Sequence, residues 1–264
     1  MFNNLDPKLI SFAIIGGFFP ALVWLFFWLR EDSKRPEPTG LILRTFLLGG
    51  LFVFLAFVLQ RTAVPFMEQF YGLPFDLTNP DWSWEFFFAS VPFLIVWAFI
   101  EEIVKFLATA IAAFGSKSFD EPIDAMIYII TAAIGFAAIE NTFFLINTLA
   151  SGENSLYFIL TGNLRFLGAT VVHIVSSAIV GGTVALTFCS STNKRILTFF
   201  VGLIMATLLH TLFNFFIIVS SNTQMFKIFL VLWVAAILVI YFFERVKRVV
   251  CMPDFKVTKT ILNN

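Results

Sequence analysis

The sequence is poor in charged residues. Of its 264 residues, 13% are Asp, Glu, Lys or Arg, whereas 59% are hydrophobic. Because about a quarter of the residues of a soluble domain are charged, this composition excludes an ordinary water-soluble enzyme and a disordered chain. With 37 Phe and 6 Trp, the chain has more apolar surface than a water-soluble core of this size could hide, which excludes a nucleic-acid binder too. What remains is a protein embedded in a lipid bilayer.

Cysteine is scarce as well. The chain has two, Cys189 and Cys251, which are too few for the disulfide framework of a secreted protein and lack the C-x-x-C spacing of a metal site. We expect both thiols to be reduced. The N-terminal segment MFNNLDPKLI lacks the basic region and the small-residue cleavage site of a signal peptide. The first apolar run is therefore expected to stay as a spanning helix.

Seven apolar runs are long enough to cross a bilayer, since about 20 residues span the hydrocarbon core as a helix. The sequence predicts an all-α fold, a polytopic membrane helix bundle forming one integral membrane domain over residues 1–264. A basic cytoplasmic tail is predicted over 244–264 and an aromatic-rich interfacial loop over 61–84, while Ser155–Leu160 is apolar but too short to span. The predicted helices cover residues 9–29, 41–60, 86–114, 122–149, 165–188, 196–220 and 226–243.

The distribution of positive charge predicts the orientation of the bundle. Most of the 17 basic residues fall in the segments that follow the first, third, fifth and seventh apolar runs. Cytoplasmic loops of membrane proteins carry such an excess of Lys and Arg. We therefore expect the N-terminus outside and the C-terminus inside (N-out/C-in).

Six ionisable side chains fall inside the middle apolar runs, where a charge costs about 2.5–3.5 kcal/mol to insert. Counted along the helices at about 1.5 Å per residue, they lie at similar depths, between the midplane and the outer half of the bilayer. One lysine cannot neutralise three carboxylates, so at least one glutamate must be protonated or bound to water, a histidine or a metal. The six residues are Glu101, Glu102, Lys105, Glu140, His173 and His210.

Each of these residues also has an ordinary structural interpretation. A single intramembrane histidine is more often a packing residue than a functional one, and Lys105 can form a structural ion pair with Glu101 or Glu102 by helical spacing. The joint pattern at one depth favours function. Other polar residues are assigned structural places: Asp120 to Pro122 as a helix N-cap and first turn, and Asn147, Asn163 and Arg165 as solvated residues at the outer interface.

The order of these motifs resembles the PrsW family of intramembrane proteases, within the group that includes the CAAX prenyl endopeptidases. The chain reads E-E-x-x-K at 101–105, G-F-x-x-x-E-N at 135–141, a lone helical His173 and H-x-x-x-N at 210–214. The resemblance covers about residues 95–220, within catalytic helices placed at about 86–220. CAAX endopeptidases proper have an arginine after the glutamate pair and a histidine closing the second motif. Lys105 and Glu140 stand there instead, which favours the PrsW branch.

The resemblance implies an endopeptidase that cuts membrane-anchored proteins, typified by anti-sigma factors, near the outer face of a bacterial or archaeal cytoplasmic membrane. A carboxylate, Glu101 or Glu140, would activate water as a general base, with His173 assisting and His210 and Asn214 stabilising the oxyanion. Lys105, Asn141 and Phe136 would have supporting roles. The implied catalytic residues are Glu101, Glu102, Glu140, His173, His210 and Asn214.

The sequence leaves cofactor and function class open. A metal-free mechanism is favoured because H-E-x-x-H is absent, but zinc held by Glu140, His173 and His210 is an alternative. The same residues could form a proton or cation relay in a transporter or channel, or belong to a non-catalytic binding or immunity protein. The expected partners are a membrane-anchored substrate and the lipid bilayer, with no nucleic acid; the oligomeric state stays open.

Overall fold

The computed structural model describes residues 7–30, 35–71, 83–151, 164–220, 222–249 and 251, and in this part of the chain it contains helices and no strand. Seven helices are long and apolar enough to cross a membrane, η1 and α6 together providing one span. The predicted all-α membrane bundle is confirmed. In chain order the elements are α1 (Pro7–Arg30), α2 (Thr39–Tyr71), α3 (Trp84–Ala112), α4 (Pro122–Ala150), the π-helical turn η1 (Arg165–Ala169), α6 (Thr170–Leu186), α7 (Thr192–Val219) and α8 (Asn222–Val246).

The second helix is longer than predicted. The prediction ended it at residue 60, where the apolar run stops, but α2 continues to Tyr71 and includes Pro65. Hydrophobicity marks the part of a helix in lipid and not its end, and one proline removes only one intrahelical hydrogen bond. As a result Gln60 lies inside a helix, and its side chain is buried in the bundle. The rest of the predicted loop up to residue 82, and Ser155–Leu160, lie outside the described residues.

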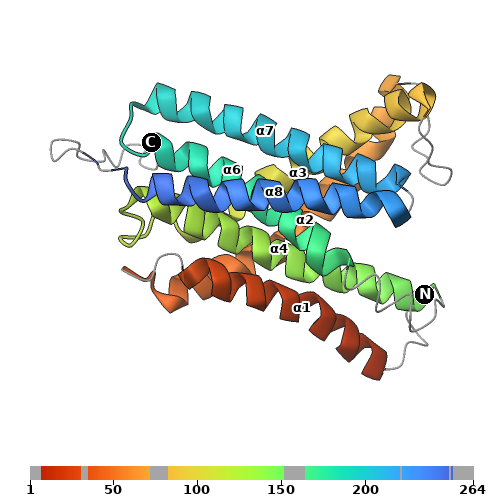
Figure 1. The fold of residues 1–264 in the computed structure, drawn as a ribbon, viewed down its shortest axis with the longest axis horizontal. Helices are drawn as coiled ribbons and strands as arrows, with labels where there is room; N and C mark the ends of the chain where they lie inside the picture. Colours follow the sequence, from red (N-terminus) through yellow and green to blue (C-terminus); the bar gives the residue numbers. More distant parts are fainter. Residues whose placement is uncertain are drawn as a thin grey trace.

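Helix α4 is the centre of the bundle. It packs against α1, α2 and α6, and 94% of its most apolar window is buried. Figure 1 shows α1 on one side of α4 and α6 and α8 on the other. A helix that is apolar around its whole circumference suits such a position. Its N-terminus has the predicted cap, because Glu121 and Asp124 form a capping box and Pro122 follows directly.

Glycine contacts bring α2 close to α4. A methyl group on Gly135 would lie 2.0 Å from the carbonyl oxygen of Phe46, and one on Gly49 would lie 2.1 Å from that of Ala132. Small residues allow membrane helices to pack backbone against backbone, where van der Waals contact replaces the hydrophobic effect. This packing fixes the distance between α2, which carries Gln60, and the helix that carries Glu140.

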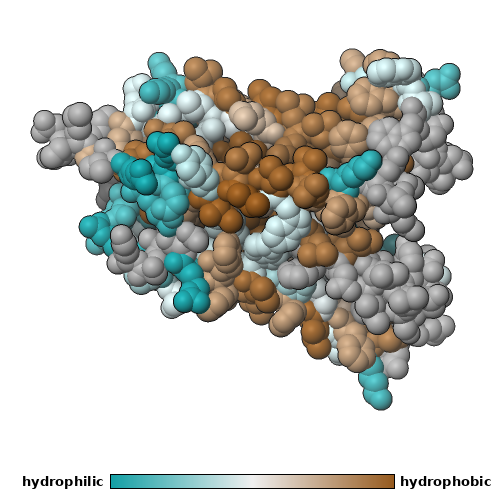
Figure 2. Space-filling view, in the orientation of Figure 1, coloured by the Kyte–Doolittle hydropathy of each residue, from teal (hydrophilic) through white to brown (hydrophobic). Residues whose placement is uncertain are grey.

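The outer surface matches a membrane environment. Large apolar side chains on α1, α2, α7 and α8 are exposed, among them Phe19, Phe57, Leu197 and Val231. Figure 2 shows hydrophobic residues across the middle of the visible face and hydrophilic ones gathered near its ends. Such a belt is what a lipid bilayer covers.

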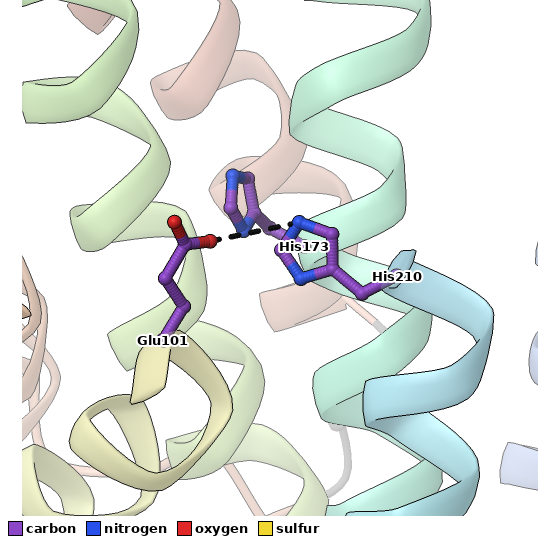
Figure 3. Close-up of side chains that lie close together, drawn as sticks. All are labelled: Glu101, His173 and His210. Atoms are coloured by element: carbon purple, nitrogen blue, oxygen red, sulfur yellow. Dashed lines mark ion pairs between the residues drawn. The ribbon is translucent and has the colours of Figure 1, made fainter. Parts of the chain in front are cut away.

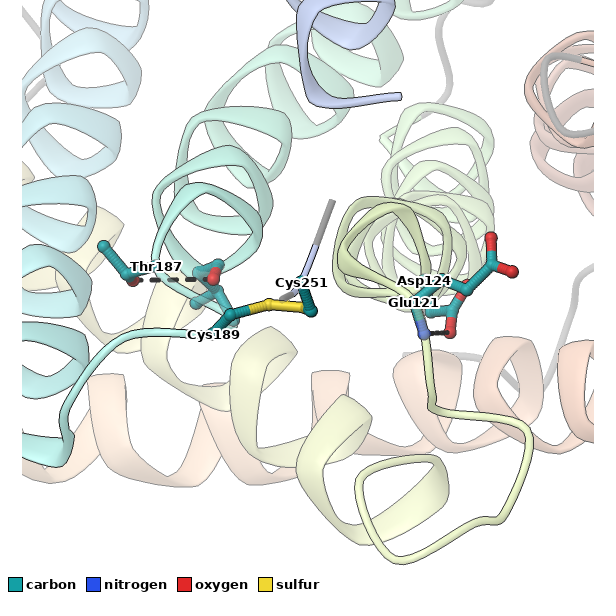
Figure 4. Close-up of a disulfide and its surroundings, with 6 residues drawn as sticks. Glu121, Asp124, Thr187, Cys189 and Cys251 are labelled. Carbon is teal, nitrogen blue, oxygen red and sulfur yellow. Dashed lines mark hydrogen bonds between the residues drawn. A yellow bond between two sulfur atoms is a disulfide. The ribbon is translucent and has the colours of Figure 1, made fainter. Parts of the chain in front are cut away.

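Cys189 and Cys251 form a disulfide, with their Cα atoms 5.6 Å apart (Figure 4). The expectation of two reduced thiols is therefore wrong for this structure. The two cysteines are 62 residues apart in sequence, but α6 packs against α8, so the turn after α6 and the end of α8 meet at the same end of the bundle. The predicted orientation places this end on the cytoplasmic side.

We predict that Gly135→Ala lowers the thermal stability of the detergent-solubilised protein. The added methyl group would overlap the backbone of Phe46, and overpacking of this kind costs about 1–3 kcal/mol. Gly40→Ala is the matched control, since nothing lies within 4 Å of the added atom. Equal melting temperatures for the two variants, measured by intrinsic fluorescence, would contradict the close packing of α2 on α4.

Candidate active site

Four helices bring the ionisable residues of the sequence motifs together in the interior of the bundle. Helix α3 carries Glu101 and Glu102, α4 carries Glu140, α6 carries His173 and α7 carries His210. The two imidazole rings meet edge to face with centroids 4.9 Å apart. The depths estimated from the sequence therefore correspond to one cluster.

One carboxylate and two imidazoles form a set that could hold a metal ion. Among the described residues, ligand atoms of Glu101, His173 and His210 all lie within 4.8 Å of one another, and Figure 3 shows the three side chains pointing toward one another. Glu101 Oε2 lies 3.6 Å from His210 Nε2, and Glu101 Oε1 accepts a hydrogen bond of 2.8 Å from Gln60 Nε2. Glu101 is held by an amide and forms no ion pair with a lysine or arginine in the described part of the chain.

Glu102 orients the ring of His210. Its Oε1 lies 2.8 Å from His210 Nδ1 and also accepts bonds from Lys105 Nζ at 2.6 Å and Ser176 Oγ at 2.8 Å. The Glu102 and Lys105 side chains are 0% and 1% exposed. Because an ionised carboxylate only accepts, Nδ1 carries a hydrogen, and Nε2 is the nitrogen that faces Glu101. A proton, a water molecule or a metal ion can lie between this nitrogen and the Glu101 carboxylate.

Glu140 orients the ring of His173 in the same way. Glu140 Oε2 lies 2.6 Å from His173 Nε2, and the other nitrogen, Nδ1, lies 3.3 Å from Lys105 Nζ. Glu140 Oε1 is 3.4 Å from Arg165 Nη2. The site thus contains two parallel series, each with a cation, a carboxylate and a histidine.

Three contributors were not predicted for the site. Gln60 and Ser176 hydrogen-bond the two glutamates of α3. Arg165, predicted to be a solvated interfacial residue, instead has a side chain only 14% exposed and pairs with Glu140. The sequence did contain a signal for Gln60, because it is a polar residue that follows an apolar run. The predicted helix ended at residue 60, however, so Gln60 was expected at the end of a helix and not in the interior of the bundle.

The remaining predicted residues lie nearby with different degrees of involvement. The centroids of the Phe136 and His173 rings lie 5.5 Å apart. Lys105 Nζ lies 5.7 Å from the centroid of the Phe136 ring. Asn141 hydrogen-bonds Thr170 and Arg165. Asn214 is half-buried on α7 and makes no side-chain hydrogen bond to another described residue.

Solvent or substrate reaches the cluster most easily at Glu140. Its side chain is 23% exposed, whereas that of Glu101 is 6% and that of His210 is 3% exposed. Glu140 is ten residues from the end of α4 that the predicted orientation places outside. A substrate bond that reached the cluster from this side would meet proton acceptors, proton donors and possible metal ligands.

Comparison with known proteins agrees with the geometry. Residues 37–242 match the model of the PrsW family intramembrane metalloproteases. The chain belongs to this family. It is 26% identical to Protease PrsW of Bacillus subtilis over 80% of this chain and 85% of that protein, and 26% identical to that of Halalkalibacterium halodurans over 83% and 90%. The Clostridioides difficile protein is 25% identical over 84% of this chain and 82% of its own.

Membership in the PrsW family makes the chain a multi-pass membrane peptidase, as the motifs predicted. No solved structure shows a significant match to it. The family description includes a metal, whereas the sequence favoured a metal-free mechanism. The zinc set predicted from the sequence contained Glu140, whereas the set of ligand atoms that lie within 4.8 Å of one another in the described part of the chain contains Glu101 with the two histidines.

We predict that Lys105→Met destabilises the folded protein by about 3–5 kcal/mol, because it leaves the buried Glu102 carboxylate without its ammonium partner. Denaturation in detergent, followed by far-UV circular dichroism, measures the change. Lys117→Met, at an exposed lysine in the turn after α3, is the control. The double variant Glu102→Gln/Lys105→Met should be more stable than Lys105→Met alone. If its loss of stability equalled the sum of the losses of Glu102→Gln and Lys105→Met, the pairing would be contradicted.

Proposed function

We propose that this protease hydrolyses peptide bonds of membrane-anchored proteins close to the outer face of a cytoplasmic membrane. Anti-sigma-factor-like proteins, cut at a first site to start a signalling cascade, are the substrate class that the family resemblance implies. The partial exposure of Glu140 supports access from the outer side. The observation that carries the proposal is the convergence of Glu101, His173 and His210 within 4.8 Å in the interior of a membrane bundle.

The charges of the site support a role in water activation. Glu102 is fully buried and already engaged by Lys105, Ser176 and His210, so it is suited to orienting His210 and not to taking up a proton. Glu140 is the most exposed of the three carboxylates. It lies where it can accept the proton of an attacking water as general base. The protonated Glu140 can then give this proton to the leaving amine, while His173 Nε2–H, hydrogen-bonded to Glu140, keeps the carboxyl group oriented.

The donor set also fits a zinc ion. Two imidazole nitrogens and one carboxylate oxygen are the ligands of catalytic zinc sites, where the metal polarises the carbonyl and makes its bound water acidic. Glu101, His173 and His210 would hold the ion. The carboxylates behind both histidines match the hydrogen bonds that orient metal-bound imidazoles.

A metal-free route with the same residues is the alternative for the mechanism. Both ring nitrogens of His173 are already hydrogen-bonded, to Lys105 and Glu140, so binding a metal there requires one of them to move. Without a metal, Glu101 would serve as the general base, since it forms no ion pair with a lysine or arginine in the described part of the chain. Asn214, one turn after His210, keeps its predicted role as an oxyanion donor.

A transporter or channel is the second candidate from the sequence, and the geometry favours it less. Ion pathways need polar groups from one face of the membrane to the other. Here the ionisable side chains form one compact cluster, in which the two histidine rings lie 4.9 Å apart. A silent binding or immunity protein has no need for two histidines that are each oriented by a carboxylate.

The first experiment compares the N-termini of membrane proteins, by mass spectrometry, in cells that express the wild type or Glu101→Gln at matched levels. We expect new N-termini within or just outside spanning segments in the wild type only. Glu85→Gln, on an exposed residue in the first turn of the same helix, should behave like the wild type. Identical termini in all three samples would disprove the protease proposal and direct attention to ion flux.

Metal removal separates the two mechanisms. We expect the purified protein to contain about one zinc ion per chain by elemental analysis, and 1,10-phenanthroline to abolish cleavage while the non-chelating 1,7 isomer does not. His210→Asn should lower the zinc content. Full activity in a metal-free preparation would contradict the zinc assignment and support Glu101 as the general base.

A further inference from the structure

Arg165 is the second cation of the cluster, and neither the sequence motifs nor the family comparison assigns it a role. Its Nε donates a hydrogen bond of 2.6 Å to Asn141 Oδ1, and its Nη2 lies 3.4 Å from Glu140 Oε1. The guanidinium carbon lies 3.7 Å from the centroid of the Phe144 ring, a cation–π contact. Arg165 is therefore held from three directions with its charge facing Glu140.

The polar partners of Arg165 form a closed network. Asn141 Nδ2 donates to Thr170 Oγ1 at 2.9 Å, and Thr170 Oγ1 donates to the carbonyl oxygen of Arg165 at 3.1 Å. The backbone N–H of Thr170 also bonds that carbonyl, which closes the π-helical turn η1. Single π-helical turns are frequent at functional sites, because the wider turn changes which residues share a face.

The network divides the two oxygens of Glu140 between two partners. Oε1 faces Arg165 at 3.4 Å and Oε2 faces His173 Nε2 at 2.6 Å. Arg165, Glu140 and His173 thus repeat the arrangement of Lys105, Glu102 and His210. In both series a cation, Lys105 buried and Arg165 half-buried, pairs with a carboxylate, and that carboxylate contacts one nitrogen of a histidine.

We propose that Arg165 is a positioning residue of the protease site, which acts through Glu140 to hold the His173 ring with its Nε2–H toward that carboxylate. This inference rests on the proposed function for its effect on turnover. Its structural part, the effect of Arg165 on His173, is independent of any substrate and is tested separately.

The ring of His173 provides the direct test, because the chain has only 2 histidines. Protein labelled with nitrogen-15 histidine therefore gives two ring systems in NMR spectra, which His210→Asn assigns. We expect Arg165→Met to shift the ring signals of His173 and leave those of His210 in place, while Arg165→Lys retains most of the wild-type signal. Arg44→Met is the control, since this exposed arginine donates to the carbonyl of Ile111, away from the cluster.

Two spectral outcomes would overturn the inference. Unchanged His173 signals in Arg165→Met would mean that Arg165 does not position the ring. An equal shift of both histidines would mean that the change loosens the whole bundle and that Arg165 has a merely structural role.

Kinetics test the consequence for catalysis. The probe is a synthetic peptide that spans the strongest cleavage site found in the comparison of N-termini. Loss of an orienting hydrogen bond typically costs about 10–100-fold in activity, so we expect Arg165→Met to lower kcat by that factor with KM within about twofold. Arg165→Lys should recover part of kcat, and Arg44→Met should match the wild type.

The outcomes distinguish this inference from the proposed function. A wild type that produces no new N-termini overturns the protease proposal, and with it the predicted effect on turnover. A wild type that cleaves the peptide with an Arg165→Met variant of equal kcat overturns only the inference about Arg165.

Discussion

The compensation of buried charge is the constraint on which this structure depends. Three carboxylates lie inside a membrane bundle, where an unpaired charge is strongly unfavourable. Lys105 engages Glu102 and Arg165 engages Glu140, while Glu101 is held by Gln60 and faces His210. Each cation comes with a carboxylate that orients one histidine. The third carboxylate, Glu101, has no lysine or arginine partner in the described part of the chain, and we propose that it belongs to the reacting centre together with the partly exposed Glu140.

The packing around α4 makes this compensation possible. Gly49 on α2 and Gly135 on α4 each lie directly against the backbone of the other helix. Helix α2 also packs against α3, which brings Gln60 within reach of Glu101, and the contact of α4 with α6 brings Glu140 to His173. In lipid, where apolar contact alone gives helices little reason to associate, small residues and polar bonds together determine the arrangement.

The candidate site combines features of two types of protease. Two histidines with carboxylates behind them suit a metal ion, in agreement with the description of the PrsW family. The contact of Lys105 with His173 suits a site in which protons are passed between side chains. In both proposed mechanisms, with zinc or without a metal, the reaction takes place at Glu101, His173 and His210, next to the partly exposed Glu140. The metal content of the purified protein distinguishes the two mechanisms.

The sequence by itself determined the class of fold and six ionisable residues of the cluster, because hydropathy and the cost of intramembrane charge are local properties of each residue. It predicted the seven spans and brought Glu101, Glu140, His173 and His210 to one depth. Only the tertiary structure decided which carboxylate meets which histidine, that Arg165 and Gln60 belong to the site, and that Cys189 meets Cys251. These facts depend on the rotation and distance of neighbouring helices, which side chains from several helices fix together and which no single segment encodes.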